Sequence, residues 1–157
     1  MSKILAIDTS TSRTSVAIID GDTIIFSGFR DGATAHGPSL PALVQEALAV
    51  SDVAEVVVGM GPGPFTGLRV GIAFAQSFAL VREIPVRGVC SLDAIAAHIA
   101  EKDFIITVDA RRKEVYWARY TDGVRVGEPA VNFPADVSGA PIHADLFVDM
   151  KALVKLP

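Results

Sequence analysis

The sequence predicts a two-lobed α/β fold, and three of its features carry that prediction. A three-stranded meander opens the chain, an alternation of helices and strands follows, and the meander is then repeated. In the first unit Asp8 ends a strand and Gly21 follows 13 residues later; in the second, Asp109 ends a strand and Gly123 follows 14 residues later. Two related halves of this kind predict an actin-like or ribonuclease-H-like architecture that arose by a degenerate duplication.

The first unit is the more complete of the two. Apolar and β-branched runs predict strands at residues 3–8, 14–20 and 23–30, and the last two form a hairpin. A helix follows from an N-cap at Ser39, since Pro41 is tolerated in a first turn. Its apolar positions recur at helical spacing and form one stripe: Leu40, Leu43, Val44, Ala47 and Leu48.

The middle of the chain continues this alternation. A short apolar strand at residues 55–60 ends in a loop rich in glycine and proline at residues 61–67. A second helix runs from about residue 66 to 82. A short strand at residues 86–89 and a helix from Ser91 to about Glu101 complete the unit.

The second unit is shorter. Strands are expected at residues 104–109, 114–121 and 124–126, and a last helix near residues 146–156. Four prolines after residue 128 interrupt the remainder, and no clear helix–strand–helix completion follows. We therefore place a first lobe at residues 1–100 and an abbreviated second lobe at residues 101–157.

Composition limits the expected partners and location. A net charge of −4 and a pI near 5.3 argue against a chain that binds nucleic acid by itself, and the one local basic run is Arg111-Arg112-Lys113. Cys90 is the only cysteine, which excludes an intrachain disulfide and favours a cytoplasmic location. The longest apolar segment, residues 70–81, is shorter than the roughly 20 residues that span a bilayer, so no membrane association is expected.

Two motifs have the residues to hold a phosphate. The first strand ends in a polar turn, where hydroxyl and N–H groups could bind phosphate and a carboxylate could orient a metal ion; the alternative is a turn that caps its own amides. The loop at residues 61–67 opens a helix but lacks the end of a P-loop, and its prolines remove N–H donors. Its alternative is a tight turn that lets strand and helix pack closely. The candidate phosphate contacts are Asp8, Thr9, Ser10, Thr11, Gly61 and Gly63.

Residues for metal or hydrolytic chemistry are scarce. The three histidines, His36, His98 and His143, are far apart in sequence and form no His-Glu-Xaa-Xaa-His motif. No Gly-Xaa-Ser-Xaa-Gly elbow occurs. The central strand adds no carboxylate to Asp8, although a two-metal nuclease would need several. We expect no metal site and no catalytic residue.

The helix at residues 66–82 is apolar on nearly all sides, so two of its faces are expected to be buried. One face can pack on the sheet. On another, Gly71, Ala75 and Ala79 are spaced by four and would let a second helix approach closely. Either another subunit supplies that helix, or the first helix of this chain covers the face.

Four segments together resemble the bacterial TsaB (YeaZ) family. They are ILAIDTS at residues 4–10, His36 with Leu40-Pro41, GPGPFTGLRVG at residues 61–71 and DARRKEVY at residues 109–116. The match is collinear from about residue 3 to 120, and the Phe-Thr-Gly-Leu-Arg piece is its most specific part. The resemblance implies two lobes of the actin-like superfamily (ASKHA fold), which includes Hsp70-like proteins and sugar kinases.

The resemblance also implies a role in making N6-threonylcarbamoyladenosine at position 37 of tRNAs that read ANN codons. In that family the catalytic step belongs to the paralogue TsaD. TsaB-like proteins bind TsaD as a heterodimer through helices of the N-terminal lobe and also form homodimers, and an ATPase, TsaE, joins the complex. The chain is accordingly expected to be a non-catalytic partner subunit that meets tRNA only through the complex. It should bind no cofactor alone, and the resemblance allows ATP or ADP at the subunit junction.

The family's catalytic paralogue shows what this chain lacks. TsaD-like proteins carry a His-Xaa-Xaa-Xaa-His metal pair, and the corresponding positions here are Ser91 and Ile95, whose side chains cannot replace two imidazoles. One alternative is a stand-alone actin-like ATP-binding protein or kinase that uses residues 8–11. Against it, residues 109–112 lack the glycine and hydroxyls of a second phosphate loop. The other alternative is a metallopeptidase.

The predicted partner interface combines helix facing with the family's interface. Pro64 stands where the family more usually has Ser, and the chain shortens after Val126; both departures leave the interface of the first lobe intact. The predicted interface residues are Leu40, Leu43, Val44, Ala47, Arg69, Ile72, Ala73, Gln76, Ala79 and Leu80.

Overall fold

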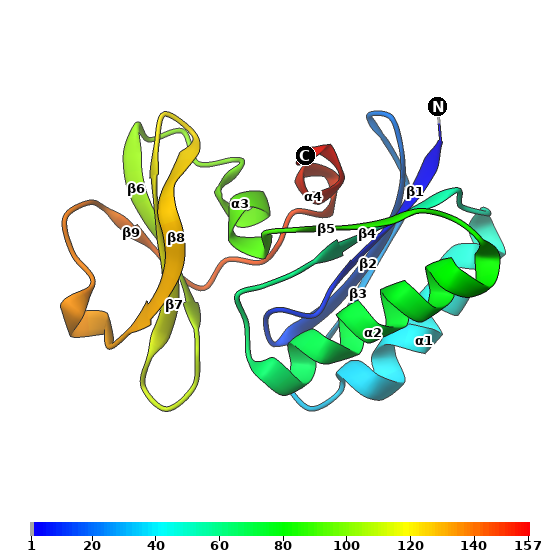
Figure 1. Cartoon of the computed structure of the whole chain (residues 1–157), viewed down its shortest axis with the longest axis horizontal. Coiled ribbons are helices and arrows are strands. Elements are labelled where there is room, and N and C mark those ends of the chain that lie inside the picture. Colours follow the sequence, from blue (N-terminus) through cyan, green and yellow to red (C-terminus); the bar gives the residue numbers. More distant parts are fainter. Residues whose placement is uncertain (1) are drawn as a thin grey trace.

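The first lobe is built on a five-stranded sheet. The computed structural model describes residues 2–157, and its first sheet has the strand order β3-β2-β1-β4-β5 (Figure 1). β2 is antiparallel to β1 and β3, whereas β4 is parallel to both β1 and β5. The strands are β1 (Lys3–Asp8), β2 (Arg13–Asp20), β3 (Thr23–Asp31), β4 (Glu55–Gly59) and β5 (Val86–Val89).

The second sheet repeats this arrangement in shorter form. Its order is β8-β7-β6-β9, with an antiparallel meander and one strand, β9, parallel to β6. β9 thus occupies the place that β4 has beside β1, and a single 3-10 turn replaces the helix of the first unit. This topology agrees with the predicted degenerate duplication. The elements are β6 (Asp103–Asp109), β7 (Val115–Thr121), β8 (Val124–Asn132), η1 (Pro134–Asp136) and β9 (Ile142–His143).

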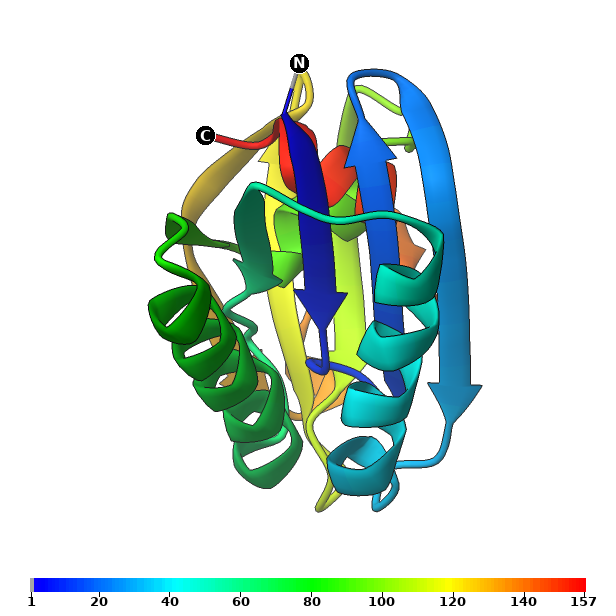
Figure 2. The same cartoon turned by 90° about the vertical axis from the view of Figure 1, so that its right-hand side faces the viewer.

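Four helices cover the two faces of the first sheet. α1 (His36–Val50) and α2 (Phe65–Arg82) lie side by side on one face (Figure 2), and α3 (Ser91–Ala96) and α4 (Met150–Lys155) lie between the two sheets (Figure 1). Because side chains alternate across a strand, β1 sends Leu5 and Ile7 under α1 and α2 and sends Ala6 toward α3 and α4. β1 therefore contributes to both hydrophobic cores.

The start of α1 differs from the sequence prediction. The helix begins at His36 rather than after Ser39, and the Ser39 N–H donates to the Ala35 carbonyl at 3.0 Å. Pro38 falls in the first turn, where a missing N–H costs nothing, so the helix can start before it. Four of the five residues of the predicted apolar stripe are buried, and the fifth, Leu48, is half-buried against the same core.

Three elements of the second half also differ from the prediction. α3 stops at Ala96 instead of continuing to residue 101, because the Ile99 N–H bonds the Ala96 carbonyl in a tighter turn that leads into β6. β8 continues to Asn132 although it contains Pro129, which is tolerated because β8 is an edge strand. The short strand β9 was not expected.

The C-terminal helix is shorter than predicted and returns to the first lobe. α4 begins after Asp149, whose carboxylate accepts a hydrogen bond from the Ala152 N–H at 2.7 Å, as an N-cap does. It packs against β1, β2 and β4, with Leu153 buried in the core between the sheets. The division of the chain at residue 100 stays a prediction.

Candidate functional site

Asp8 is the last residue of β1 and is buried, and both of its carboxylate oxygens accept hydrogen bonds from other groups of the protein. Oδ1 accepts hydrogen bonds from the N–H and the hydroxyl of Ser10, at 2.9 and 2.7 Å. Oδ2 accepts from the Ser91 hydroxyl at 2.7 Å, and that hydroxyl accepts from the Gly61 N–H at 3.0 Å. Burial raises the pKa of Asp8, and the hydrogen bonds from Ser91 and Ser10 oppose that rise. Asp8 thus ties the end of β1 to the start of α3 and to the loop after β4.

The next residue, Thr9, joins β1 to α2. Its hydroxyl donates to the Gly67 carbonyl at 2.6 Å and accepts from the Gly71 N–H at 3.1 Å. Those two backbone groups are the partners of one helical i→i+4 pair. A threonine side chain therefore lies against the first turns of the helix and bonds both groups.

The glycines of residues 59–71 permit this close packing. A Cβ on Gly59 would lie 1.7 Å from Asp8 Oδ2, one on Gly63 would lie 2.3 Å from the Ser10 carbonyl oxygen, and one on Gly71 would lie 2.5 Å from Thr9 Oγ1. No side chain fits at such distances. The loop is a structural turn that lets strand and helix pack closely, which was the alternative to a phosphate cradle.

This packing corrects most of the predicted phosphate contacts. Asp8, Thr9 and Ser10 are 1% exposed and bonded within the protein, and Gly61 and Gly63 are also buried. Of the six candidates, Thr11 alone lines an accessible cavity. A phosphate at this strand end would have to displace the hydrogen bonds of Asp8 and Thr9, so these residues do not fit the nucleotide that an actin-like fold implies.

The accessible cavity lies between the two lobes. It has a volume of ≈ 270 Å³, slightly below the roughly 300–1,000 Å³ of pockets that hold drug-sized ligands. The turn after β1, the starts of α1 and α2, the end of β6 and the segment before α4 all contribute to its walls. Its charged lining residues are two acids, Asp109 and Asp145, and one base, Arg111. Two carboxylates beside one guanidinium make a poor site for a polyphosphate.

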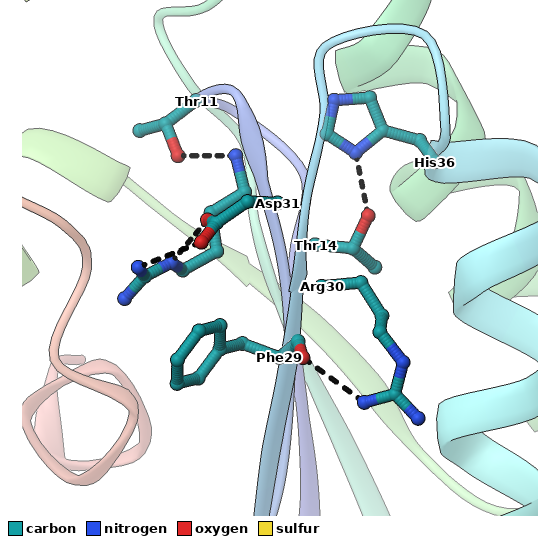
Figure 3. Close-up of polar contacts among 7 residues, drawn as sticks. Thr11, Thr14, Phe29, Arg30, Asp31 and His36 are labelled. Atoms are coloured by element: carbon teal, nitrogen blue, oxygen red, sulfur yellow. Dashed lines mark hydrogen bonds and ion pairs between the residues drawn. The ribbon is translucent and has the colours of Figure 1, made fainter.

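His36 forms a buried polar contact in the wall of this cavity (Figure 3). Its Nδ1 lies 2.7 Å from the Thr14 hydroxyl, and both residues are buried. Burial lowers the pKa of His36, a hydrogen bond with the Thr11 backbone and the Asp8 charge oppose this, and nearby Arg111 lowers it further. The neutral ring, protonated on Nε2, can accept the Thr14 hydroxyl proton at Nδ1. The ring also lies where a side chain on Gly67 would be, so it fixes α1 against α2.

The positions where the resemblance places the paralogue's metal pair have structural roles here. Ser91 is fully buried and bonds Asp8, and Ile95 is buried in the core between the sheets. Within residues 2–157, no three His, Cys, Asp or Glu side chains lie together as ligands for a metal ion. His98 and His143 instead pair with Asp149 and Glu101 near the surface.

The predicted partner interface divides into two sets. Five of its residues are core residues beneath α1 and α2, with at most 3% of their surface exposed, and this corrects their assignment to a contact surface: Leu40, Leu43, Val44, Ala47 and Ala79. A helical stripe indicates burial but does not say what covers it. The other five remain accessible on α2, with Ile72 half-buried: Arg69, Ile72, Ala73, Gln76 and Leu80.

α2 therefore has one covered face and one open face. Gly71, Ala75 and Ala79 lie against the sheet of this chain, so burial within the chain explains their spacing. The open face carries large exposed apolar side chains: Phe65 is 70% exposed and Leu80 is 78% exposed. Although α2 is the longest helix of residues 2–157, no helix in that part of the chain is long and apolar enough to cross a membrane.

Some features of the site had no sequence signal. The contact between Asp8 and Ser91 joins residues 83 positions apart. Arg13 is held between the rings of Phe29 and Phe147, 3.8 Å from each ring centre, while it pairs with Asp31. Only the fold brings residues 13, 29 and 147 together.

Comparisons with known proteins agree with this picture. The family model described as "TsaD: tRNA N6-adenosine threonylcarbamoyltransferase" matches residues 30–151. An uncharacterised protein of Mycobacterium tuberculosis is 46% identical over 94% of this chain and 76% of its own length. The tRNA threonylcarbamoyladenosine biosynthesis protein TsaB of Escherichia coli is 38% identical over 75% of this chain and 54% of its own length, and that of Bacillus subtilis is 35% identical over 74% and 54%.

Solved structures show the same fold. YeaZ from Pseudomonas aeruginosa superposes with a TM-score of 0.84 at 27% identity, over 98% of this chain and 89% of that one. Another Pseudomonas aeruginosa structure, described as similar to peptidase YEAZ, gives the same TM-score. The ethanolamine utilization protein EutJ of Carboxydothermus hydrogenoformans matches with a TM-score of 0.54 at 11% identity, over 84% of this chain and 52% of that one, which speaks for the fold alone.

Proposed function

The chain belongs to the TsaB (YeaZ) family of tRNA threonylcarbamoyladenosine biosynthesis proteins, and we propose that it acts there as the non-catalytic partner subunit of a TsaD-like protein. The observation that carries the proposal is the open face of α2. This face exposes the large apolar side chains of Leu80 and Val81 beside polar residues such as Gln76. The polar motif at the end of β1, in contrast, is bonded within the protein.

The chemistry of the open face supports a protein partner. Leu80 and Val81 are 78% and 83% exposed, and the small residue Ala73 lies on the same open face, so a partner helix can approach closely. The helix contains no acidic residue, so an apolar partner surface would meet no carboxylate on it. The contact we propose consists of the accessible part of the predicted interface: Arg69, Ile72, Ala73, Gln76 and Leu80.

Residues in the interior support the non-catalytic role. Asp8 and Ser91 bond each other, and Ile95 fills core space where the paralogue has a metal ligand. A peptidase would need an accessible hydroxyl beside a base, whereas Ser10 and Ser91 bond Asp8, and the Thr14 hydroxyl that bonds His36 is fully buried. We propose that catalysis belongs to the partner.

The remaining features of the complex are part of the same proposal. A TsaE-like ATPase joins it, tRNA is its substrate, and the site of action is the cytoplasm. Alone, the chain forms a homodimer through the open face of α2, because an unpaired apolar face associates with a second copy. ATP or ADP, if it contributes, binds at the junction of the two subunits, since the motifs of this chain are bonded internally.

Size-exclusion chromatography with light scattering tests the proposal. The chain is measured alone and mixed with the TsaD-like protein of the same genome, and a new peak with the mass of a heterodimer is expected. Ala73→Glu places a charge in the proposed contact and should weaken association by several kcal/mol, on the order of 3–5. Ala135→Glu, at an exposed position in η1, is the matched control and should associate as the wild type does. A wild-type chain that ignores the partner would contradict the proposal.

A further inference from the structure

The basic hairpin between β6 and β7 lies outside the proposed contact with a TsaD-like partner. Six basic side chains have no acidic partner within residues 2–157, and three of them are consecutive in this hairpin: Arg111, Arg112 and Lys113. All three are exposed. In a chain with a net charge of −4, this is a local excess of positive charge.

The hairpin tip is a defined structure. Its three basic residues have left-handed φ angles of 63°, 54° and 67°. The Arg111 N–H bonds Asp109 at 3.0 Å, and Ala110 and Glu114 pair through their backbones at 3.0 Å. The three charges are therefore presented from one turn at a fixed place beside the start of α2.

A groove of ≈ 480 Å³ runs between this hairpin and α2. Arg111 and Arg112 line it together with two aromatic rings, Phe65 from α2 and Tyr116 from β7. Phe65 is 70% exposed, and Glu114 is the one acidic residue in the described lining. The Phe65 ring has Arg69 over it at 5.0 Å from the centroid, and Tyr116 is half-buried against the core between the sheets. Basic side chains next to an exposed aromatic ring are a combination that binds unpaired nucleotides, since the charges hold phosphates and the ring stacks on a base.

We propose that this groove, defined by Arg111, Arg112, Phe65 and Tyr116, is a contact site for single-stranded RNA. This inference rests on the proposed function, in which tRNA is the substrate of the complex, and it gives this subunit a direct contact with that substrate. The contact is weak and dependent on salt, because two or three phosphates are neutralised and the rest of the surface is acidic. An acidic protein segment would satisfy the charges but would leave the aromatic rings without a base to stack on.

Fluorescence anisotropy of a labelled, unmodified transcript of a tRNA that reads an ANN codon tests the site on the full chain. Arg111→Gln with Arg112→Gln should lower affinity about tenfold and reduce the slope of log K against log salt by about 1.4, at about 0.7 for each single-stranded phosphate contact. Lys3→Gln with Lys102→Gln is the matched control, since it removes two unpaired, exposed lysines elsewhere and changes the net charge equally. Phe65→Leu, which keeps an apolar side chain but no stacking face, should lower affinity by several-fold.

The outcomes separate this inference from the proposed function. Equal losses in the hairpin variant and the lysine control would show a bulk charge effect and overturn the RNA site. A wild-type chain that does not bind the transcript would also overturn the RNA site. The same holds if polyglutamate displaces the bound transcript as effectively as unlabelled RNA does. In each case, light scattering of the hairpin variant with the TsaD-like protein still reports the heterodimer independently. A missing heterodimer together with hairpin-dependent RNA binding would contradict the proposed function alone.

Discussion

The two faces of α2 have opposite environments. The inner face has Gly67, Gly71, Ala75 and Ala79, all buried within this chain. The outer face has Ala73, Gln76 and Leu80, all exposed. The inner face is so close to β1 that the Thr9 hydroxyl bonds the helix backbone. The difference teaches that burial within the chain explains only one face of this helix: the inner face builds the fold, and the outer face is the one that we propose for a partner.

The largest effect should come from charging the inner face. Ala75 is fully buried, so Ala75→Glu would bury an unpaired carboxylate and should cost about 5 kcal/mol of unfolding free energy. Urea unfolding followed by circular dichroism measures this, and soluble yield shows whether the variant folds. Ala73→Glu, two residues away on the outer face, should unfold within about 0.5 kcal/mol of the wild type. Equal losses in the two variants would contradict the comparison.

A single methyl group should break the contact between α2 and β1. A Cβ on Gly71 would lie 2.5 Å from Thr9 Oγ1, and Thr9 cannot move without breaking its bond to Gly67. Overpacking and the lost hydrogen bond together should cost about 3 kcal/mol in Gly71→Ala. In Gly37→Ala the new Cβ meets nothing within 4 Å, and the exposed helical position should gain a few tenths of a kcal/mol. If Gly71→Ala unfolds like Gly37→Ala, the close packing is not essential.

The sequence predicted the elements of the first lobe well because their signals are local. Alternating and helical periodicities identified β1 to β4, α1 and α2 and the buried stripe of α1. The start of α1 was placed too late because Ser39 is a good N-cap by type, while the residue that precedes the helix is Ala35, which makes no side-chain cap. N-cap preferences rank residue types by how well they begin a helix, but they do not exclude a helix that begins one turn earlier.

The site was less predictable, because its contacts join distant segments. Asp8 was identified as important, but its partner Ser91 could be found only from the fold. The same limit explains the interface. Periodicity indicated that Leu40 and Leu43 are buried, whereas only the structure shows that β2 and β3 of the same chain cover them. The topology of the second lobe also depended on β9, whose two residues give no periodic signal.

A pH-dependent effect should follow from His36, which fixes the inner face beside Gly67. Burial lowers the folded-state pKa of His36 below its ordinary value of 6.5, so the unfolded chain takes up a proton first as the pH falls. The His36 contribution to stability is therefore intact above about pH 7 and decreases from about pH 6.5 down to the lowered folded pKa. Asp8, whose pKa burial raises, acts in the opposite direction as the pH falls through its raised pKa. Urea unfolding at pH 7.5 and 5.5 should show a smaller loss in His36→Gln than in the wild type, and an identical loss would exclude this role.

The smallest effect on stability should come from Leu80→Gln on the outer face. The side chain is 78% exposed and outside both cores, so unfolding should stay within about 0.5 kcal/mol of the wild type. Association with the TsaD-like partner should weaken about 10- to 150-fold, because a buried leucine contributes about 1.5–3 kcal/mol. Ala79→Gln, the neighbouring position on the inner face, should show the reverse pattern, with stability lost through overpacking of the core. Light scattering with the partner and urea unfolding, both measured on Leu80→Gln and Ala79→Gln, therefore distinguish the role of the outer face from that of the inner face. If Leu80→Gln lowers stability and leaves association unchanged, the outer face belongs to the fold and the partner binds elsewhere.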